Sequence, residues 1–423
     1  MKKIFNAKVL FILTILLLFL TPGICLLFSA LYSGNEENKQ QNISFVEAYP
    51  FDAADTANVS STQVNSKPTL LGIYVNAVEK VNLFVNKYSG EKNISSPFFY
   101  NVYGKITKAL GKNLIEDSES PVIKLKNGYL TTPFLYSQTP EAYKCFSDFN
   151  KWMNKKQIPF FTMITADKSD DRHADYPTGV PYGYSKKEKE YIAYLKDNGI
   201  VYLDSRKVLL SENNDFFSWF YKTDHHWNVQ AGFSIAAATT KKMKEEFGLN
   251  VDVDILDRKN FKSVKYKDVF LGSQGKKVTH GYISPEDFEV YYPVFDTSFS
   301  IQIPNIGVDK TGDFKDTLIK SDALKTDYYY LDNAYLAFLY GDTPLTRIHN
   351  PKCKNGTRLL VIKESKANAV NTYLAFSVEY LDIIDPRHFD GSVRTFIEKT
   401  EPDIVLTCIC PPMLGSNEMW DIK

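Results

Sequence analysis

Short apolar runs alternate with helix-length segments through much of this chain, and that alternation constrains its fold more than any other feature. The C-terminal part predicts strands at 358–364, 380–384 and 403–408, with helices at 365–377 and 391–399 between them. Residues 139–203 carry the same alternation of helix, strand, helix and strand. A continuous apolar run such as 359–362 is typical of a strand that is covered on both faces. The pattern therefore predicts parallel β units within an α/β domain.

Capping signals mark two of the predicted helix starts. Thr139 stands before Pro140, and this pair predicts an N-cap followed by the first residue of a helix at 140–156. Ser185 and Glu188 have the spacing of a capping box, in which each side chain bonds the backbone of the other. Strands at 158–164 and 200–203 should follow these two helices.

The N-terminal segment predicts a membrane anchor. Basic residues at 1–8 precede an uncharged apolar run at 9–32, which reaches the ~20 residues that a membrane-spanning helix needs. The basic flank should stay in the cytoplasm, so the rest of the chain would lie outside the cell membrane as a single-pass protein. A cleaved signal peptide is the competing interpretation.

The remaining organisation is simpler. Residues 33–66 are polar and aperiodic and predict a linker. We expect one domain at 67–423, with an insertion or elaboration around 250–340 whose place in the fold the pattern does not define. Lys plus Arg and Asp plus Glu number 50 each, so the chain lacks the cationic excess typical of nucleic-acid binding.

The five cysteines show neither zinc-site spacing nor a disulfide framework. Cys408 and Cys410 alternate on a predicted strand, which favours packing on one face and leaves a disulfide as the alternative. We expect no cofactor.

The sharpest local signal is the tetrad Asp224-His225-His226-Trp227, which lies directly before a predicted helix at 229–247. In an extended loop, residues i and i+2 project to the same side. Asp224 could therefore hold Nδ1–H of His226 and leave Nε2 free as a general base. A capped helix start whose histidines merely pack is the structural alternative. Metal binding by the acid and both histidines, as in a metal-dependent hydrolase, is a third interpretation.

Ser365 is the best-placed nucleophile for such a pair. It follows the predicted strand 358–364 and opens a helix, so it should lie at the carboxyl end of a parallel strand, where α/β proteins bind ligands. Backbone N–H groups at a helix start would also favour an oxyanion there. The structural alternative is that Ser365 only caps the helix.

The tetrad and the segments around it resemble the DHHW family of the SGNH-hydrolase superfamily, which is similar to alginate O-acetylation proteins. The resemblance extends over about 120–410. The other matching segments are the turn Asp167-Lys168, the stretch 335–342, the strand that ends at Ser365, and the segment 385–389.

This resemblance implies an SGNH-type three-layer α/β sandwich with a mostly parallel central sheet, circularly permuted and preceded by a transmembrane helix. It also implies that Asp224 orients, His226 acts as base and Ser365 attacks an acetyl ester. The acyl-serine would pass its acetyl group to a sugar hydroxyl or to water. The implied partners are a polysaccharide substrate and an acyl donor, which a multi-pass membrane acyltransferase would present.

One departure from the family pattern bears on activity. The family carries Asp-Ser at the nucleophile, whereas this chain has Glu364-Ser365. The longer side chain could displace the turn by about 1 Å, a shift that can cost about a hundredfold in rate. The resemblance therefore leaves two functions open: a serine esterase or O-acetyltransferase, and a catalytically impaired scaffold or glycan-binding protein of the cell envelope.

Four further residues are assigned by position alone. The second oxyanion donor would be the N–H of Gly341, at the end of a predicted strand 335–340, unless this residue is a plain turn glycine. Asp385 and Arg387 would shape the site or form a structural salt bridge. Trp227 would pack beneath the histidine or offer a platform to a sugar.

Overall fold

The protein is described by a computed structural model, which defines residues 96–115, 120–180, 182–326 and 328–415. The chain divides into two compact units, 1–103 and 104–423. Of the first unit only the beginning of helix α3 (Ser96–Ala109) is described. The predicted segments 1–8, 9–32 and 33–66 lie outside the described residues. Within those residues, no helix has the length and apolar character to cross a bilayer.

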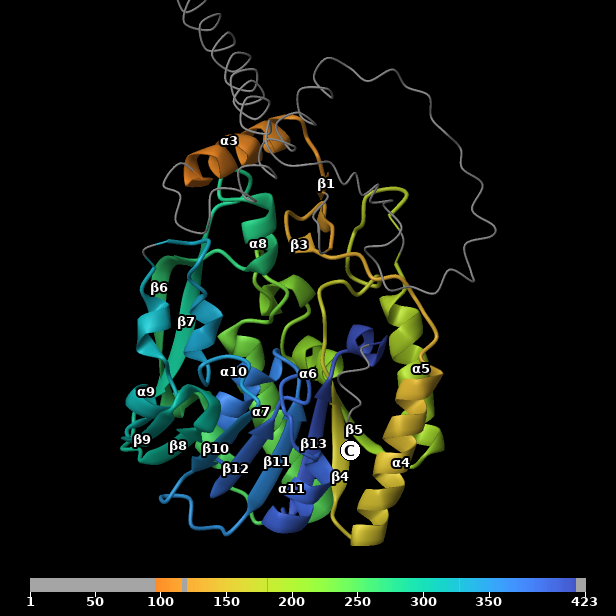
Figure 1. Ribbon diagram of the computed structural model, residues 1–423, viewed down its shortest axis with the longest axis vertical. Helices are drawn as coiled ribbons and strands as arrows, with labels where there is room; N and C mark the ends of the chain where they lie inside the picture. Colours follow the sequence, from red (N-terminus) through yellow and green to blue (C-terminus); the bar gives the residue numbers. More distant parts are fainter. Residues whose placement is uncertain (1–95, 116–119, 181, 327, 416–423) are drawn as a thin grey trace, which may run out of the picture. The chain divides into compact units, whose positions relative to one another are not determined.

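An eight-stranded sheet forms the centre of the second unit, with the order β5-β4-β13-β11-β12-β10-β8-β9 (Figure 1). Its parallel part consists of β5 (Val201–Asp204), β4 (Phe160–Ile164), β13 (Ile404–Ile409), β11 (Arg358–Lys363) and β12 (Tyr380–Ile384). Its antiparallel part consists of β10 (Leu345–His349), β8 (Phe299–Ile303) and β9 (Val308–Gly312). The prediction of an α/β domain with parallel units is confirmed.

Helices cover both faces of this sheet, because its central strands are apolar on both sides. On β11, Leu359 and Val361 join one buried cluster, whereas Leu360 and Ile362 join another. The first face is covered by α6 (Ser205–Glu212), α7 (Val229–Phe247) and α10 (Ala367–Leu374). The second is covered by α4 (Pro140–Lys156), α5 (Tyr184–Asp197) and α11 (Val393–Thr400). The result is a three-layer arrangement.

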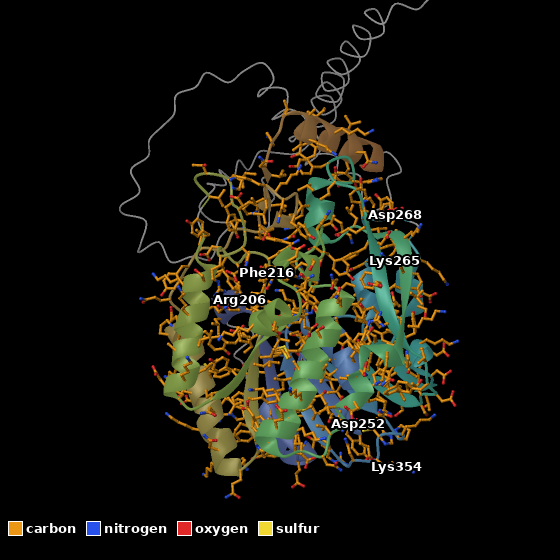
Figure 2. All side chains as sticks on the ribbon, turned by 180° about the vertical axis from the view of Figure 1, so that it is seen from behind. Arg206, Phe216, Asp252, Lys265, Asp268 and Lys354 are labelled. Carbon is orange, nitrogen blue, oxygen red and sulfur yellow. The ribbon has the colours of Figure 1, made fainter. Side chains whose placement is uncertain are left out.

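The segment 250–340, which the sequence did not place, divides between two structures. Strands β8 and β9 extend the central sheet, while β6 (Phe261–Phe270) and β7 (Glu286–Pro293) form a separate antiparallel hairpin. Lys265 and Asp268 mark β6 in Figure 2. The short helix α8 (Ser273–Val278) lies between the hairpin strands in sequence, and α9 (Phe314–Thr317) follows β9.

A small antiparallel sheet contains β1 (Leu114–Ile115), β2 (Val122–Lys124) and β3 (Leu130–Thr131). The 3-10 helices are η1 (Phe216–Trp219), η2 (Asp254–Leu256), η3 (Arg258–Asn260), η4 (Pro304–Ile306), η5 (Ser321–Leu324), η6 (Ala334–Ala337) and η7 (Pro411–Gly415).

The predicted helix α7 is confirmed at both ends. The Asn228 side chain accepts a hydrogen bond from the Ala231 N–H, and Gly248 ends the helix with a left-handed φ of 67°. These two residues fix where the tetrad loop stops and the helix starts.

The predicted start of α4 is confirmed in position, because Thr139 is the N-cap residue and Pro140 the first helical residue, whereas the predicted capping box of α5 is wrong. Thr139 makes no side-chain cap, because its hydroxyl accepts from Lys187 Nζ at 2.6 Å. Ser185 lies inside α5, where its hydroxyl donates to Asp171 at 2.6 Å, and Glu188 is buried in an ion pair with Arg172. Tertiary partners thus replaced the local bonds that the spacing suggested.

Helix α7 crosses α10 at Gly232, where a β-carbon would lie 2.7 Å from Cβ of Ala369 and 3.1 Å from its carbonyl carbon. We expect Gly232→Ala to lower the free energy of unfolding by about 1–3 kcal/mol, because two helix backbones must separate to admit the methyl group. Urea unfolding of both proteins measures this difference. An unchanged midpoint would contradict the close crossing.

Candidate functional site

The carboxyl ends of the parallel strands meet at one edge of the sheet, and the candidate residues lie there. Thr165 follows β4, Glu364 follows β11, Asp385 follows β12 and Cys410 follows β13. The tetrad joins this edge from the loop before α7. Ligands in α/β proteins bind at such an edge, so the predicted location is the expected one.

Asp224 and His226 form the predicted acid–base pair. The Asp224 carboxylate contacts His226 Nδ1 closely and accepts from the His226 backbone N–H at 3.0 Å. Its second oxygen accepts from the Ser273 N–H at 2.6 Å. Burial alone would raise the pKa of Asp224, but the two neighbouring histidines and these hydrogen bonds hold it well below its usual value. An ionised Asp224 places the ring proton of His226 on Nδ1 and leaves Nε2 as the acceptor.

The ring of His226 is held between two other rings. The centroid of Tyr335 lies 3.7 Å away at 16°, and that of His225 lies 3.9 Å away at 37°. Two rings this close cannot share one face without overlapping, so they lie on opposite faces. His226 Nε2 is buried and has no hydrogen-bond partner among the described residues. A buried acceptor without a partner is costly, which marks a position where a ligand or a moving side chain can bond.

His225 is the exposed member of the group. Its side chain is 41% exposed, against 8% for His226, and its Nδ1 lies 3.0 Å from Ser273 Oγ. One ligand atom from each of Asp224, His225 and His226 lies within 4.8 Å of the others, so these residues could hold a metal ion. Metal binding through the contacting atoms would compete with the Asp224–His226 hydrogen bond. The donor set therefore fits an acid–base pair better.

The tetrad loop is held in place by two charged groups, the half-buried Glu286 and the buried Lys168. Glu286, at the start of β7, accepts from the Lys222 N–H at 2.8 Å and from both the N–H and the hydroxyl of Thr223 at 2.6 Å. Lys168 donates from Nζ to the Tyr221 carbonyl at 2.8 Å and to the Lys222 carbonyl at 3.2 Å. Burial lowers the pKa of Lys168 to about 8. The backbone immediately before Asp224 is thereby fixed from both sides.

A cluster of charged residues supports the loop that follows β4. Arg206 on α6 lies 3.5 Å from Glu188 and 3.7 Å from Asp170. Phe216 stacks on His173 with centroids 4.2 Å apart. Figure 2 labels Arg206 and Phe216 on the segment that leads from β5 toward the tetrad.

Ser365 lies in a turn between β11 and α10, and it is not the helix cap, because Lys366 occupies that position. Its hydroxyl donates to the Glu364 carboxylate at 3.4 Å and makes no hydrogen bond to His226 Nε2. Glu364 also accepts from the Lys366 N–H at 3.0 Å and from the Thr165 hydroxyl at 2.9 Å. The long Glu364 side chain thus folds back onto its own turn.

Three contacts nevertheless bring the tetrad and this turn together. The Tyr335 hydroxyl donates to the Lys366 carbonyl at 3.1 Å and to the Ser365 carbonyl at 3.4 Å. Trp227 Nε1 donates to the same Lys366 carbonyl at 2.7 Å. These contacts place the base and the candidate nucleophile next to one another at this edge of the sheet.

Beneath the turn, Lys366 forms a buried ion pair with Asp167 at 2.8 Å. Burial opposes the ionised state of Asp167, but Lys366 outweighs it and lowers the pKa of Asp167 to about 2. Cys410 lies 3.5 Å from Lys366 Nζ, and burial raises its pKa well above the usual value. Both Cys408 and Cys410 are free thiols, as the packing interpretation predicts.

For Gly341 and Trp227 the structural alternatives hold: Gly341 is a turn glycine and Trp227 packs in the interior, so the oxyanion-donor and sugar-platform interpretations are wrong. Residues 335–340 form no strand but continue from η6 into a turn with left-handed φ values at Leu339, Tyr340 and Gly341. The Gly341 N–H donates to the Phe338 carbonyl at 3.1 Å, so it is engaged in that turn. Trp227 is completely buried and presents no face to a sugar.

The Ser365 N–H, by contrast, has no acceptor among the described residues and remains available to an oxyanion.

Asp385 and Arg387 form part of an ion network beside the site. Arg387 binds Asp385 at 2.6 and 2.9 Å and reaches Asp342 at 3.1 Å. Lys363 bridges the same two carboxylates at 2.6 and 3.1 Å. The Asn368 amide on α10 donates to Asp342 at 3.0 Å. The salt-bridge interpretation therefore holds, and the network fixes the ends of β11 and β12.

Sequence reasoning missed the residues that hold the pair in place: Gly272, Ser273, Glu286 and Tyr335. Their contacts with the tetrad span roughly 50 to more than 100 positions, and no local spacing signals such a pairing. Lys168 and the stretch beginning at Tyr335 stood out only through the family resemblance.

The fold is that of an α/β domain with a mostly parallel central sheet, and part of it matches a known family. Residues 127–263 match the family described as "SGNH hydrolase-like domain, acetyltransferase AlgX". No curated protein matches the chain.

Two solved structures share the fold. A DHHW family protein from Eubacterium siraeum DSM 15702 has 18% identity and a TM-score of 0.55, covering 74% of this chain and 97% of that one. PatB1 from Bacillus cereus, solved with a sulfonyl adduct, has 17% identity and a TM-score of 0.59, covering 71% and 98%. The match at 127–263 supports the resemblance to SGNH-hydrolase-like proteins, and the two structures show that the chain shares the fold of a DHHW family protein and of PatB1.

Gly272 leaves room for the acid. A β-carbon at this position would overlap Cβ of Asp224 and lie 2.6 Å from its Oδ2, although the backbone φ of −68° suits any residue. We expect Gly272→Ala to keep the fold but displace Asp224. In proton NMR, the low-field His226 Nδ1–H signal, assigned with Asp224→Asn, should disappear or move upfield. A signal identical to that of the wild type would contradict this packing.

The lowered pKa of Lys168 should make the free energy of unfolding depend on pH. Its folded-state pKa of about 8 lies below the usual 10.5, so between these values the unfolded chain binds more protons at this site. The stability of the wild type relative to Lys168→Met should therefore rise with pH across that window. Urea unfolding of both proteins tests this, and a constant difference would show that Lys168 titrates normally.

Proposed function

We propose that this protein is a serine-dependent O-acetyltransferase or esterase that acts on an envelope or secreted polysaccharide. The observation that carries the proposal is the buried Asp224–His226 pair, whose Nε2 is unpartnered beside the Ser365 turn. The family matched by residues 127–263 is named for an acetyltransferase, which supports the reaction class.

The reaction would proceed in two steps. Ser365 Oγ bonds to the acyl carbon while its proton moves to His226 Nε2, and the ester oxygen then leaves with that proton. Asp224 stabilises the imidazolium that exists between these transfers. The Ser365 N–H would donate to the oxyanion. In the second step a sugar hydroxyl or water gives its proton to His226 and bonds to the acyl carbon; the bond from that carbon to Ser365 Oγ breaks, and His226 returns the proton to Ser365 Oγ.

The resting hydroxyl must first leave Glu364, to which it donates at 3.4 Å, and rotate toward His226 Nε2. Catalytic hydrogen bonds are often incomplete without ligand and form in the substrate complex. The same contact favours the second candidate function, a scaffold or glycan-binding protein in which Glu364 keeps the serine from the base.

The proposal extends to the setting of the enzyme. Segment 9–32 would anchor the chain as a single membrane-spanning helix, with domain 67–423 outside the cell membrane. A multi-pass membrane acyltransferase would supply the acyl group. The acid and base precede the nucleophile in the chain, so the fold would be a circular permutation of the usual SGNH order.

Trapping of the acyl-enzyme tests the function. Purified protein treated with p-nitrophenyl acetate should release a burst of nitrophenol and gain one acetyl group in intact-protein mass. Ser365→Ala should abolish the adduct, and His226→Ala should slow its formation by at least about a thousandfold. Ser234→Ala, which removes a serine on α7 that bonds Glu212, should behave as the wild type.

Turnover that survives Ser365→Ala and His226→Ala would contradict the proposal. A wild type that forms no adduct would favour the scaffold function. With an active wild type, added oligosaccharides distinguish transfer from hydrolysis.

A further inference from the structure

We propose that Tyr335 is a positioning residue that aligns the base with the nucleophile turn. It stacks on His226 and hydrogen-bonds the backbone that carries Ser365. This inference rests on the proposed function and assigns a role that neither the tetrad nor the serine supplies.

The stacking contact fixes the base. Tyr335 is 3% exposed, and its ring lies almost parallel to the His226 ring at 3.7 Å. Asp224 holds Nδ1, and His225 covers the opposite face of the ring. These three neighbours together restrict rotation of the imidazole. When His226 takes the serine proton, the resulting cation faces an aromatic ring, which stabilises it.

The hydroxyl contact fixes the nucleophile. A peptide carbonyl accepts two hydrogen bonds, and on Lys366 these come from Tyr335 Oη at 3.1 Å and Trp227 Nε1 at 2.7 Å. The Tyr335 hydroxyl also reaches the Ser365 carbonyl at 3.4 Å. One side chain therefore touches the base through its ring and the nucleophile turn through its hydroxyl.

This arrangement matters because the Ser365 turn has little else to direct it toward His226. Glu364 draws the hydroxyl in another direction, and the helix begins only at Ala367. A displacement of about 1 Å between reacting groups can cost about a hundredfold in rate. Tyr335 and Trp227 are the contacts that oppose such a displacement from the tetrad side.

Tyr335→Phe tests the hydroxyl separately from the ring. It should lower the acylation rate constant and kcat about tenfold to a hundredfold, while KM for p-nitrophenyl acetate stays at the wild-type value. Tyr335→Leu, which also removes the stacked ring, should lose more.

Tyr191→Phe is the matched control, because its completely buried hydroxyl bonds Thr162 on the other face of the sheet. It should acylate at the wild-type rate even if it is equally destabilised.

Rates are measured well below each melting temperature, with the folded fraction followed by circular dichroism. An active wild type with an equally active Tyr335→Phe would overturn this inference and leave the proposed function intact. A rate loss that Tyr191→Phe shares would likewise reduce Tyr335 to a packing residue. Absence of any acyl-enzyme in the wild type would overturn both proposals.

Discussion

The burial of one carboxylate, Asp224, is the constraint on which the site depends. A buried charge is costly unless it is paired and hydrogen-bonded, and here the His226 ring and two backbone N–H groups meet that need. Those partners come from the tetrad and from the start of α8, so the acid forces distant segments together. Gly272 lets the backbone approach closely enough, and Glu286 with Lys168 fixes the preceding loop.

Local patterns predicted most of the architecture, because parallel strands and their covering helices produce an alternation of short apolar runs and helix-length segments in the sequence. Helix α7 matches its predicted bounds, since the Asn228 cap and Gly248 act within one turn of the chain. The side-chain cap bonds expected at Thr139 and Ser185 do not form, because distant partners, Lys187 and Asp171, bond those side chains. Segment 250–340 resisted prediction because β8 pairs with β10, which lies outside the segment, and because helix α8 interrupts the hairpin of β6 and β7.

The candidate site divides in the same way. The i, i+2 relation between Asp224 and His226 is local, so the sequence could predict their contact. The position of His226 relative to Ser365 depends on side chains that are distant in sequence, so no local spacing predicts it. Tyr335 and Trp227 link the tetrad to the serine turn, whereas Glu364 holds the serine hydroxyl away from the base. The carboxylate that accepts from the serine hydroxyl is thus the residue at which this chain departs from the family pattern.

We infer that Ser365 is the nucleophile and that the Asp224–His226 pair serves it. The most direct test is to label the protein with an arylsulfonyl fluoride and to locate the adduct by peptide mass spectrometry, with His226→Ala beside it. We expect a single adduct on Ser365, and this adduct should form far more slowly in His226→Ala. An adduct on Ser273, whose hydroxyl lies 3.0 Å from His225 Nδ1, or labelling of Ser365 that is indifferent to His226, would contradict it.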